Sequence, residues 1–130
     1  MTAEEFAARA VGIPWVRWRS GWDACDCFGL LVLYHREVHG LDLGAVPETD
    51  IAAGFARAAG WRECAAEDAA ACFMAWRNGA PTHCGIVLPG RRLLHAEGSP
   101  EHPGSARVSR LQLVARVYGD LRFYRYSPTC

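Results

Sequence analysis

The sequence predicts an α+β fold in which N-terminal helices pack on a C-terminal antiparallel sheet. In the first half of the chain, apolar residues recur at spacings of three and four, which is typical of amphipathic helices. After residue 70 the apolar residues alternate with polar ones or form short runs between turns, which is typical of strands. The chain has 130 residues and shows no internal repeat and no linker, so we expect a single domain over residues 1–130.

Two helices are expected before residue 40. Thr2 and Glu5 form a capping box, which predicts a short helix over about residues 3–11. A second helix is predicted to begin at Asp26 and to end at Gly40. Its apolar positions make one stripe: Cys27, Leu30, Leu31, Tyr34 and Val38.

A third helix and the strands follow. The stretch PETDIAAGFARAAGW (47–61) is amphipathic, with Thr49 or Asp50 as its N-cap and Gly60 as its end. A short apolar run, AACFMAW (70–76), then leads into the sheet. The expected strands are THCGIVL (82–88), RLLHAEG (92–98), RVSRLQLV (107–114) at an edge, and DLRFYRY (120–126) as the strand that closes the sheet.

Composition excludes several classes of function. Apolar residues make up 51% and charged residues 22% of the chain, as in ordinary globular proteins. The net charge is zero and the arginines are scattered, so we do not expect a nucleic-acid partner. No apolar run approaches the roughly 18 residues that a membrane span needs. The start MTAEEFAARAVG lacks the apolar core of a secretory signal peptide, so we expect no export by that route.

The six cysteines do not form a recognisable framework. They are sparse and irregularly spaced for a disulfide scaffold, and a single CxC without a second pair does not predict structural zinc. Cys64 and Cys72 lie among alanines and are expected to be small buried groups. In HREVH, His35 and His39 lie one helical turn apart, but the glutamate is not in the second position of an HExxH motif, so a solvated helix face is expected instead.

Cys27 is the predicted nucleophile. Cysteine catalysis requires a thiolate, a base that takes its proton and a group that orients the base. The free N–H groups and the dipole at a helix N-terminus favour a thiolate, and Asp26 can cap those groups beside Cys27. Cys25 lies before the helix, outside that field.

His83 and His95 are the predicted base and orienting group. With a three-residue turn at 89–91, Leu88 pairs with Arg92 and Gly85 lies opposite His95. The two histidines then share a face of the sheet as diagonal neighbours, and Gly85 leaves room for the His95 ring. A two-residue turn would place them on opposite faces.

These residues resemble a known family. DCFGL (26–30), HCGIVL (83–88) and LLHA (93–96) are similar to the three motifs of NlpC/P60 cysteine peptidases, in the same order. The resemblance covers about residues 12–126 and implies a papain-like fold with Cys27 as nucleophile, His83 as base and His95 as the orienting residue. DCFGLLVLYHREVHGLDL most resembles the branch found in phage tail assembly proteins and gene-transfer particles. That branch implies a virion tail component, made in the bacterial cytoplasm, which contacts other tail proteins and cleaves peptidoglycan stem peptides without a cofactor.

The sequence departs from the family at two positions. The family commonly has a tyrosine that helps to form the oxyanion hole twelve residues before the nucleophile, and Trp15 stands there. The usual Gly-Asp pair before the preceding strand is replaced by EDAAACF, in which only Asp68 matches. Trp15, Trp18 and Trp22 are expected either to line a substrate cleft or to pack the loop.

Four hypotheses follow. The first is a thiol hydrolase of amide bonds with Cys27, His83 and His95 as its catalytic residues. The second is a structural tail protein that keeps the fold but cleaves little. The third is acyl transfer to a non-peptide acceptor by the same residues. The fourth is a minor metal site formed by Cys25, Cys27 and His83.

Overall fold

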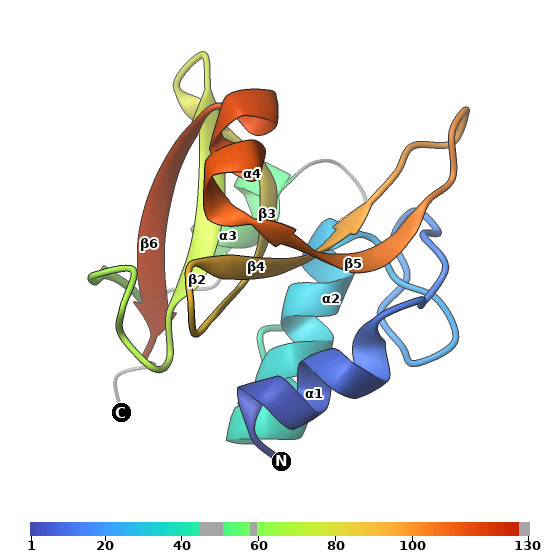
Figure 1. Cartoon of the computed structure of the whole chain (residues 1–130), viewed down its shortest axis with the longest axis horizontal. Coiled ribbons are helices and arrows are strands. Elements are labelled where there is room, and N and C mark those ends of the chain that lie inside the picture. Colours follow the sequence, from blue (N-terminus) through green and yellow to red (C-terminus); the bar gives the residue numbers. More distant parts are fainter. Residues whose placement is uncertain (45–50, 58–59, 128–130) are drawn as a thin grey trace.

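The computed structural model describes residues 1–44, 51–57 and 60–127. Four α-helices, a π-helix and six strands lie in these ranges (Figure 1). They are, in chain order, α1 (Ala3–Ala10), α2 (Cys27–Tyr34), η1 (His35–His39), α3 (Ile51–Arg57), β1 (Trp61–Glu63), β2 (Cys72–Arg77), β3 (Ala80–Leu88), β4 (Arg92–Glu97), β5 (Ser105–Arg110), α4 (Leu111–Tyr118) and β6 (Asp120–Tyr126). None of the helices among the described residues is long and apolar enough to span a membrane.

The first helix begins and ends as its sequence predicts. The hydroxyl of Thr2 accepts the Glu5 N–H at 3.1 Å, and the Glu5 carboxylate accepts the Thr2 N–H at 3.0 Å. This reciprocal pair satisfies two N–H groups that the helix itself leaves without partners. Phe6 and Ala10 are fully buried, so α1 packs one face on the core.

The second helix is buried on every side, not along one stripe. All seven residues from Phe28 to Tyr34 are buried, because β3 and β4 on one side and α1 and the 14–25 loop on the others enclose the helix. The helix widens into the π-helix η1 at His35 and ends at Gly40, whose φ of 65° lies in the left-handed region that glycine tolerates. The predicted end at Gly40 is confirmed.

The strands form one antiparallel sheet in the order β1-β6-β2-β3-β4-β5. The strand over residues 120–126 is confirmed, but β6 lies between β1 and β2 instead of at an edge. The three-residue strand β1 at that edge was not predicted, and the caps expected at Thr49 and Asp50 lie outside the described residues. In Figure 1, β4 and β5 run across the direction of β2 and β6, so the sheet is strongly bent.

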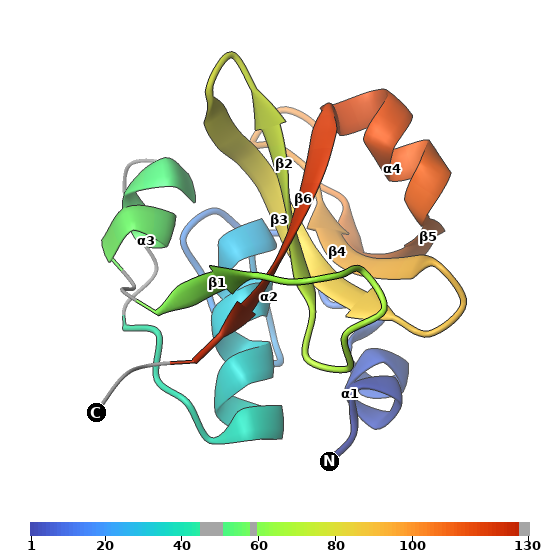
Figure 2. The same ribbon diagram turned by 90° about the vertical axis from the view of Figure 1, so that its left-hand side faces the viewer.

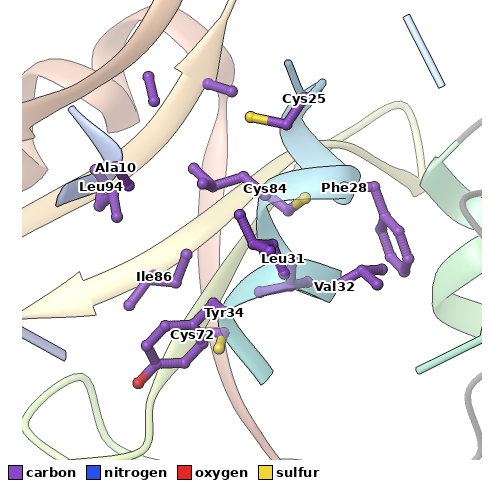
Figure 3. Close-up of a cluster of buried hydrophobic side chains, with 14 of the residues drawn as sticks. Ala10, Cys25, Phe28, Leu31, Val32, Tyr34, Cys72, Cys84, Ile86 and Leu94 are labelled. Carbon is purple, nitrogen blue, oxygen red and sulfur yellow. The ribbon is translucent and has the colours of Figure 1, made fainter. Parts of the chain in front are cut away.

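Helices cover both faces of this sheet. On one face α1, α2 and α3 enclose the larger core, in which Leu31 of α2 meets Cys84 and Ile86 of β3 (Figure 3). On the other face α4 packs a smaller core, and Figure 2 shows it on the opposite side of the sheet from α2 and α3. The smaller core contains Ala71, Phe73, Val87, Leu93, Leu111 and Val114. The α+β fold class is confirmed, and the single helical layer is corrected to helices on both faces.

The expected strand over residues 107–114 is correct only in its first part. β5 ends at Arg110 and is the edge strand, as predicted, but Leu111 begins α4. The physical reason is a helical spacing within the same segment. Leu111, Val114 and Tyr118 recur at intervals of three and four, and these residues turn toward the second face of the sheet.

Gly29 offers a test of this packing. A Cβ atom at Gly29 would overlap the carbonyl oxygen of Arg19, which lies in the backbone of the preceding loop. We expect Gly29→Ala to lower the free energy of unfolding by about 3 kcal/mol, because a backbone atom cannot move aside cheaply. Thermal or urea unfolding followed by circular dichroism measures the effect.

Gly21→Ala is the control substitution, in the loop that precedes α2. The nearest side-chain atom there is the carboxylate of Asp23, an exposed group that can rotate away, so we expect a change of about 0.5 kcal/mol or less. Equal effects of the two substitutions would contradict the close approach of Arg19 to α2.

Candidate active site

Cys27 is the first residue of α2, and Asp26 caps the helix. The two carboxylate oxygens of Asp26 accept the N–H of Gly29 at 2.7 Å and the N–H of Trp18 at 2.6 Å. Asp26 therefore joins the preceding loop to the start of α2 and fixes the place where the Cys27 side chain leaves the helix. Burial, with the negative charge of Cys27 as a further cause, raises the pKa of Asp26 to about 6, although the two N–H donors act in the opposite direction.

His83 and His95 lie on neighbouring strands in the predicted register. Residues 86–88 of β3 pair with residues 92–94 of β4 across the three-residue turn. The Nε2 atom of His83 lies 2.8 Å from the Nδ1 atom of His95, so the predicted contact between the two imidazoles is confirmed. Both rings are almost completely buried.

Gly85 is necessary for this contact. A Cβ atom at Gly85 would overlap the carbonyl oxygen of Leu94 and would lie 2.7 Å from a ring carbon of Phe73 and 3.1 Å from the Cβ atom of His95. The missing side chain therefore lets β4 come close to β3 just before His95. Any larger residue would push the two histidines apart.

The Cys27 thiol is electrostatically linked to two neighbouring residues of β3. Interactions with the Cys84 side chain, in the first place, and with His83 lower the pKa of the Cys27 thiol well below its ordinary value, in spite of the desolvation that burial causes. The backbone of Cys84 acts on this pKa in the same direction. Burial together with the thiolate of Cys27 raises the pKa of Cys84, so Cys84 stays a neutral donor. The site thus favours a thiolate at Cys27 and a thiol at Cys84.

His95 is neutral at physiological pH. Burial, with the positive charge of His83 as a second cause, lowers the pKa of His95 to about 4. Its Nε2 atom lies 2.9 Å from the hydroxyl of Ser109 on β5, so both ring nitrogens of His95 have partners. A neutral ring in this place can orient His83 without competing for its charge.

A ring stack holds the other side of His83. The Tyr118 ring lies parallel to the His83 ring, with 4.0 Å between the centroids and an angle of 14° between the planes. The Tyr118 hydroxyl donates to the Glu97 carboxylate at 2.7 Å, and Glu97 also pairs with Arg107 at 3.3 Å. The end of α4 is therefore tied to β4 and β5 while its ring covers the imidazole.

Sequence reasoning missed Ser109, Tyr118 and the thiol contact of Cys84. Ser109 could have been found, because it lies diagonally from His95 once residues 93 and 109 are paired. Tyr118 had no such signal, because residues 115–119 lie between the two strands expected over 107–114 and 120–126. Cys84 points to the face opposite His83. An alternating strand pattern therefore does not reveal that both residues influence the Cys27 thiol.

Cys25 differs from Cys27 in its burial and in the pKa of its thiol. It is fully buried, and its backbone N–H donates to the carbonyl oxygen of Pro14. Burial raises the pKa of Cys25 to about 12, with the neighbouring Asp26 as the second cause. Burial also raises the pKa of Cys64 and of Cys72. These thiols are protonated at neutral pH.

The tryptophans of the first loop lie in different environments. Trp15 forms a bridge with Cys25 through its backbone, and its side chain packs against Gly98 in the loop after β4. Trp22 packs on Phe6 and beneath the Arg9 guanidinium. Trp18 is exposed and has a φ of 63°, and its N–H is held by Asp26. Packing of the loop accounts for Trp15 and Trp22.

His35 is not on a solvated face, contrary to expectation. Its ring is buried, its Nδ1–H donates to the carbonyl oxygen of Leu31 at 2.9 Å, and Trp61 and Tyr126 pack edge-on against it. Burial lowers the pKa of His35 to about 4. His39 is exposed as expected. No group of three or more His, Cys, Asp or Glu side chains in the described part of the chain is arranged to hold a metal ion.

The lowered pKa of Cys27 predicts selective alkylation. At about pH 6 an ordinary thiol is almost entirely protonated, whereas Cys27 keeps a large thiolate fraction because its pKa lies below the ordinary value. We expect iodoacetamide to label Cys27 ahead of the other described cysteines, as measured by peptide mass spectrometry. Unfolding in urea should abolish the preference. Slow and uniform labelling of the folded protein would contradict the described electrostatics.

The ring stack predicts a second effect on the thiolate. Tyr118→Leu removes the ring that lies parallel to the His83 imidazole and holds it in place, so alkylation of Cys27 at about pH 6 should slow about fivefold, the equivalent of about 1 kcal/mol. Tyr118→Phe keeps the ring and loses the bond to Glu97, and it should retain most of the rate. Equal losses in both variants would assign the effect to the hydroxyl instead.

Comparisons with known proteins agree with this architecture. No family model matches the sequence, and no curated protein is significantly similar to it. Among solved structures, the chain is similar to the NlpC/p60 domain of the peptidoglycan hydrolase SagA, at 21% identity and a TM-score of 0.68, over 95% of each chain. It is also similar to NlpC1 from Trichomonas vaginalis, at 14% identity and a TM-score of 0.66, over 97% of this chain but 43% of that one. The chain therefore has the papain-like fold of NlpC/p60 domains.

Proposed function

We propose that this chain is a cysteine peptidase which hydrolyses amide bonds of peptidoglycan stem peptides. The observation that carries the proposal is the convergence of one sulfur and two imidazoles from three separate segments. Cys27 has a lowered pKa beside His83, and His83 bonds the neutral His95 at 2.8 Å. A nucleophile, a base and an orienting group in this arrangement fit nucleophilic amide hydrolysis.

The proposed reaction has two halves. The Cys27 thiolate attacks the carbonyl carbon, and the protonated His83 donates its proton to the departing amine as the acyl-enzyme forms. Neutral His83 then takes a proton from water, and the resulting hydroxide attacks the thioester to release the acid and regenerate the thiolate. His95 keeps the His83 ring in place throughout. The reaction needs neither a metal nor an organic cofactor.

Charge that develops on the carbonyl oxygen requires hydrogen-bond donors. The backbone N–H of Cys27, at the positive end of α2, is the first proposed donor. Trp15 stands where related domains commonly have a tyrosine, and its indole N–H is the second proposed donor.

The substrate class is proposed from two sources. The SagA domain, to which the chain is similar over nearly its whole length, belongs to a peptidoglycan hydrolase. The motifs around Cys27, His83 and His95 resemble those of NlpC/P60 peptidases. The residues after Cys27 further resemble the phage tail branch of that family, so we propose that the enzyme acts as part of a virion tail together with other tail proteins.

The second candidate is a structural tail protein that retains the fold but cleaves little. Trp15 favours it, because a weaker oxyanion hole would lower the rate of hydrolysis while leaving the fold intact. The same catalytic residues could also transfer the acyl group to an acceptor other than water. Product analysis distinguishes these possibilities from the first proposal.

Digestion of purified peptidoglycan tests the proposed function. Wild type should release stem-peptide fragments with new amino and carboxyl termini, as measured by mass spectrometry. Cys27→Ala should lose roughly 10⁴-fold or more of this activity, because the nucleophile is removed. Cys25→Ala, a change of the same chemical kind two residues away, should retain most of it, and circular dichroism should show that both variants are folded.

Three other outcomes would overturn the proposal. Equal digestion by all three proteins would remove Cys27 from the reaction. Folded wild type that alkylates at Cys27 but releases no fragments would favour the structural candidate. Products that carry an added acceptor group in place of water would favour acyl transfer.

A further inference from the structure

We propose that Ser109 is a positioning residue which fixes the tautomer of His95 and thereby keeps the Nδ1 atom of His83 free to take the proton of Cys27. This inference rests on the proposed function, since it assumes that His83 is the base for Cys27. Ser109 lies on β5, outside the three sequence motifs that suggest the catalytic residues. Its hydroxyl is the last member of a row of contacts that begins at the Cys27 sulfur.

The contacts form a continuous row across three strands. Interactions with His83 on β3 lower the pKa of the Cys27 thiol, and the Nε2 atom of His83 lies 2.8 Å from the Nδ1 atom of His95 on β4. The Nε2 atom of His95 lies 2.9 Å from the hydroxyl of Ser109 on β5. The His95 side chain has a relative exposure of 1%, so protein atoms surround its ring nitrogens.

The position of Ser109 follows from the strand register. Ser109 pairs with Leu93 and Arg107 pairs with His95, so Ser109 is a diagonal neighbour of His95 on the same face. A serine side chain is short enough to reach the edge of the ring without displacing it. The sheet itself thus presents the hydroxyl to the nitrogen that faces away from His83.

The ion pair permits only one arrangement of protons. When Cys27 is a thiolate, its proton is on His83, which then carries a proton on each ring nitrogen. The Nε2–H of His83 donates to the Nδ1 atom of His95, so Nδ1 must be the unprotonated nitrogen of that neutral ring. The single proton of His95 is therefore on Nε2, where it donates to the oxygen of Ser109.

Loss of the Ser109 hydroxyl disfavours the tautomer of His95 that carries its proton on Nε2. Without Ser109, the Nε2–H of His95 is a buried donor without an acceptor, which proteins strongly avoid. The proton of His95 can instead move to Nδ1 and donate to the Nε2 atom of His83. His83 then carries its proton on the nitrogen that faces Cys27 and cannot accept another there. The neutral thiol is favoured over the ion pair.

The test compares Ser109→Ala with Ser109→Thr. Threonine keeps a hydroxyl on the same carbon and suits an edge strand, so it is the matched control. In protein labelled with ¹⁵N-histidine, ring-nitrogen chemical shifts report which nitrogen of His95 carries the proton. The rate of alkylation of Cys27 by iodoacetamide, measured against pH, reports the thiolate fraction. Thermal unfolding shows that each variant is folded.

We expect wild type and Ser109→Thr to hold the His95 proton on Nε2 and to alkylate rapidly at about pH 6. Ser109→Ala should move that proton to Nδ1 and should alkylate about tenfold more slowly at about pH 6, an upward shift of about one unit in the pKa of Cys27. Its rate above about pH 10, where the thiol is ionised without help, should equal that of wild type.

Two results would overturn the inference. Ser109→Ala with an unchanged tautomer and an unchanged pH profile would reduce Ser109 to a structural residue, whatever happens to the unfolding temperature. A Ser109→Thr variant that behaves like Ser109→Ala would show that the hydroxyl is not responsible. Neither readout uses peptidoglycan, so wild type that fails to digest the wall refutes the proposed function and leaves these results standing.

Discussion

The hydrogen bond between the two imidazoles is the contact on which the site depends. It joins Nε2 of His83 to Nδ1 of His95 at 2.8 Å, and backbone geometry sets it more than the two side chains do. The three-residue turn after β3 puts both histidines on one face, and Gly85 lets the strands approach closely enough for the rings to meet. A shift of one residue in this hairpin would send one ring to the opposite face and would leave His83 without an orienting partner.

The distribution of charge follows from the same packing. Burial lowers the pKa of His95 to about 4, so the ring that bonds His83 is uncharged at neutral pH and, unlike a carboxylate, places no negative charge beside it. Cys27 lies at the positive end of α2, and the side chain of Cys84 is the first cause of the lowered pKa of its thiol. A negative charge is favoured at this partly buried sulfur because these neighbouring groups outweigh the cost of desolvation.

The sequence predicts those features that depend on local chemistry. The capping box at Thr2, the start of α2 at Cys27 and the register of the β3–β4 hairpin each follow from a few adjacent residues, and the structure has them all. What was missed depends on distant contacts. Residues 111–118 carry apolar side chains that suit a strand or a helix, and the second apolar face of the sheet decides for the helix. Burial of His35 likewise depends on Trp61 and Tyr126, far away in the sequence.

The pairing between β3 and β4 ends next to His83 and Cys84, on the segment that influences Cys27. His83 and Cys84 point to opposite faces, yet both residues lower the pKa of the Cys27 thiol. Pairing between β3 and β4 covers residues 86–88 and 92–94, whereas β4 continues with β5 through residue 97. Residues of β3 that precede Ile86 therefore form no strand pairing with β4. The edge of β3 that faces β4 is free of strand pairing at Cys84. The first residue of α2, Cys27, packs against the core on one face of the sheet. Tyr118 of α4 stacks on His83 at the other face. Helices on both faces thus frame the candidate site, because α2 carries Cys27 as its first residue and α4 carries the ring that stacks on His83.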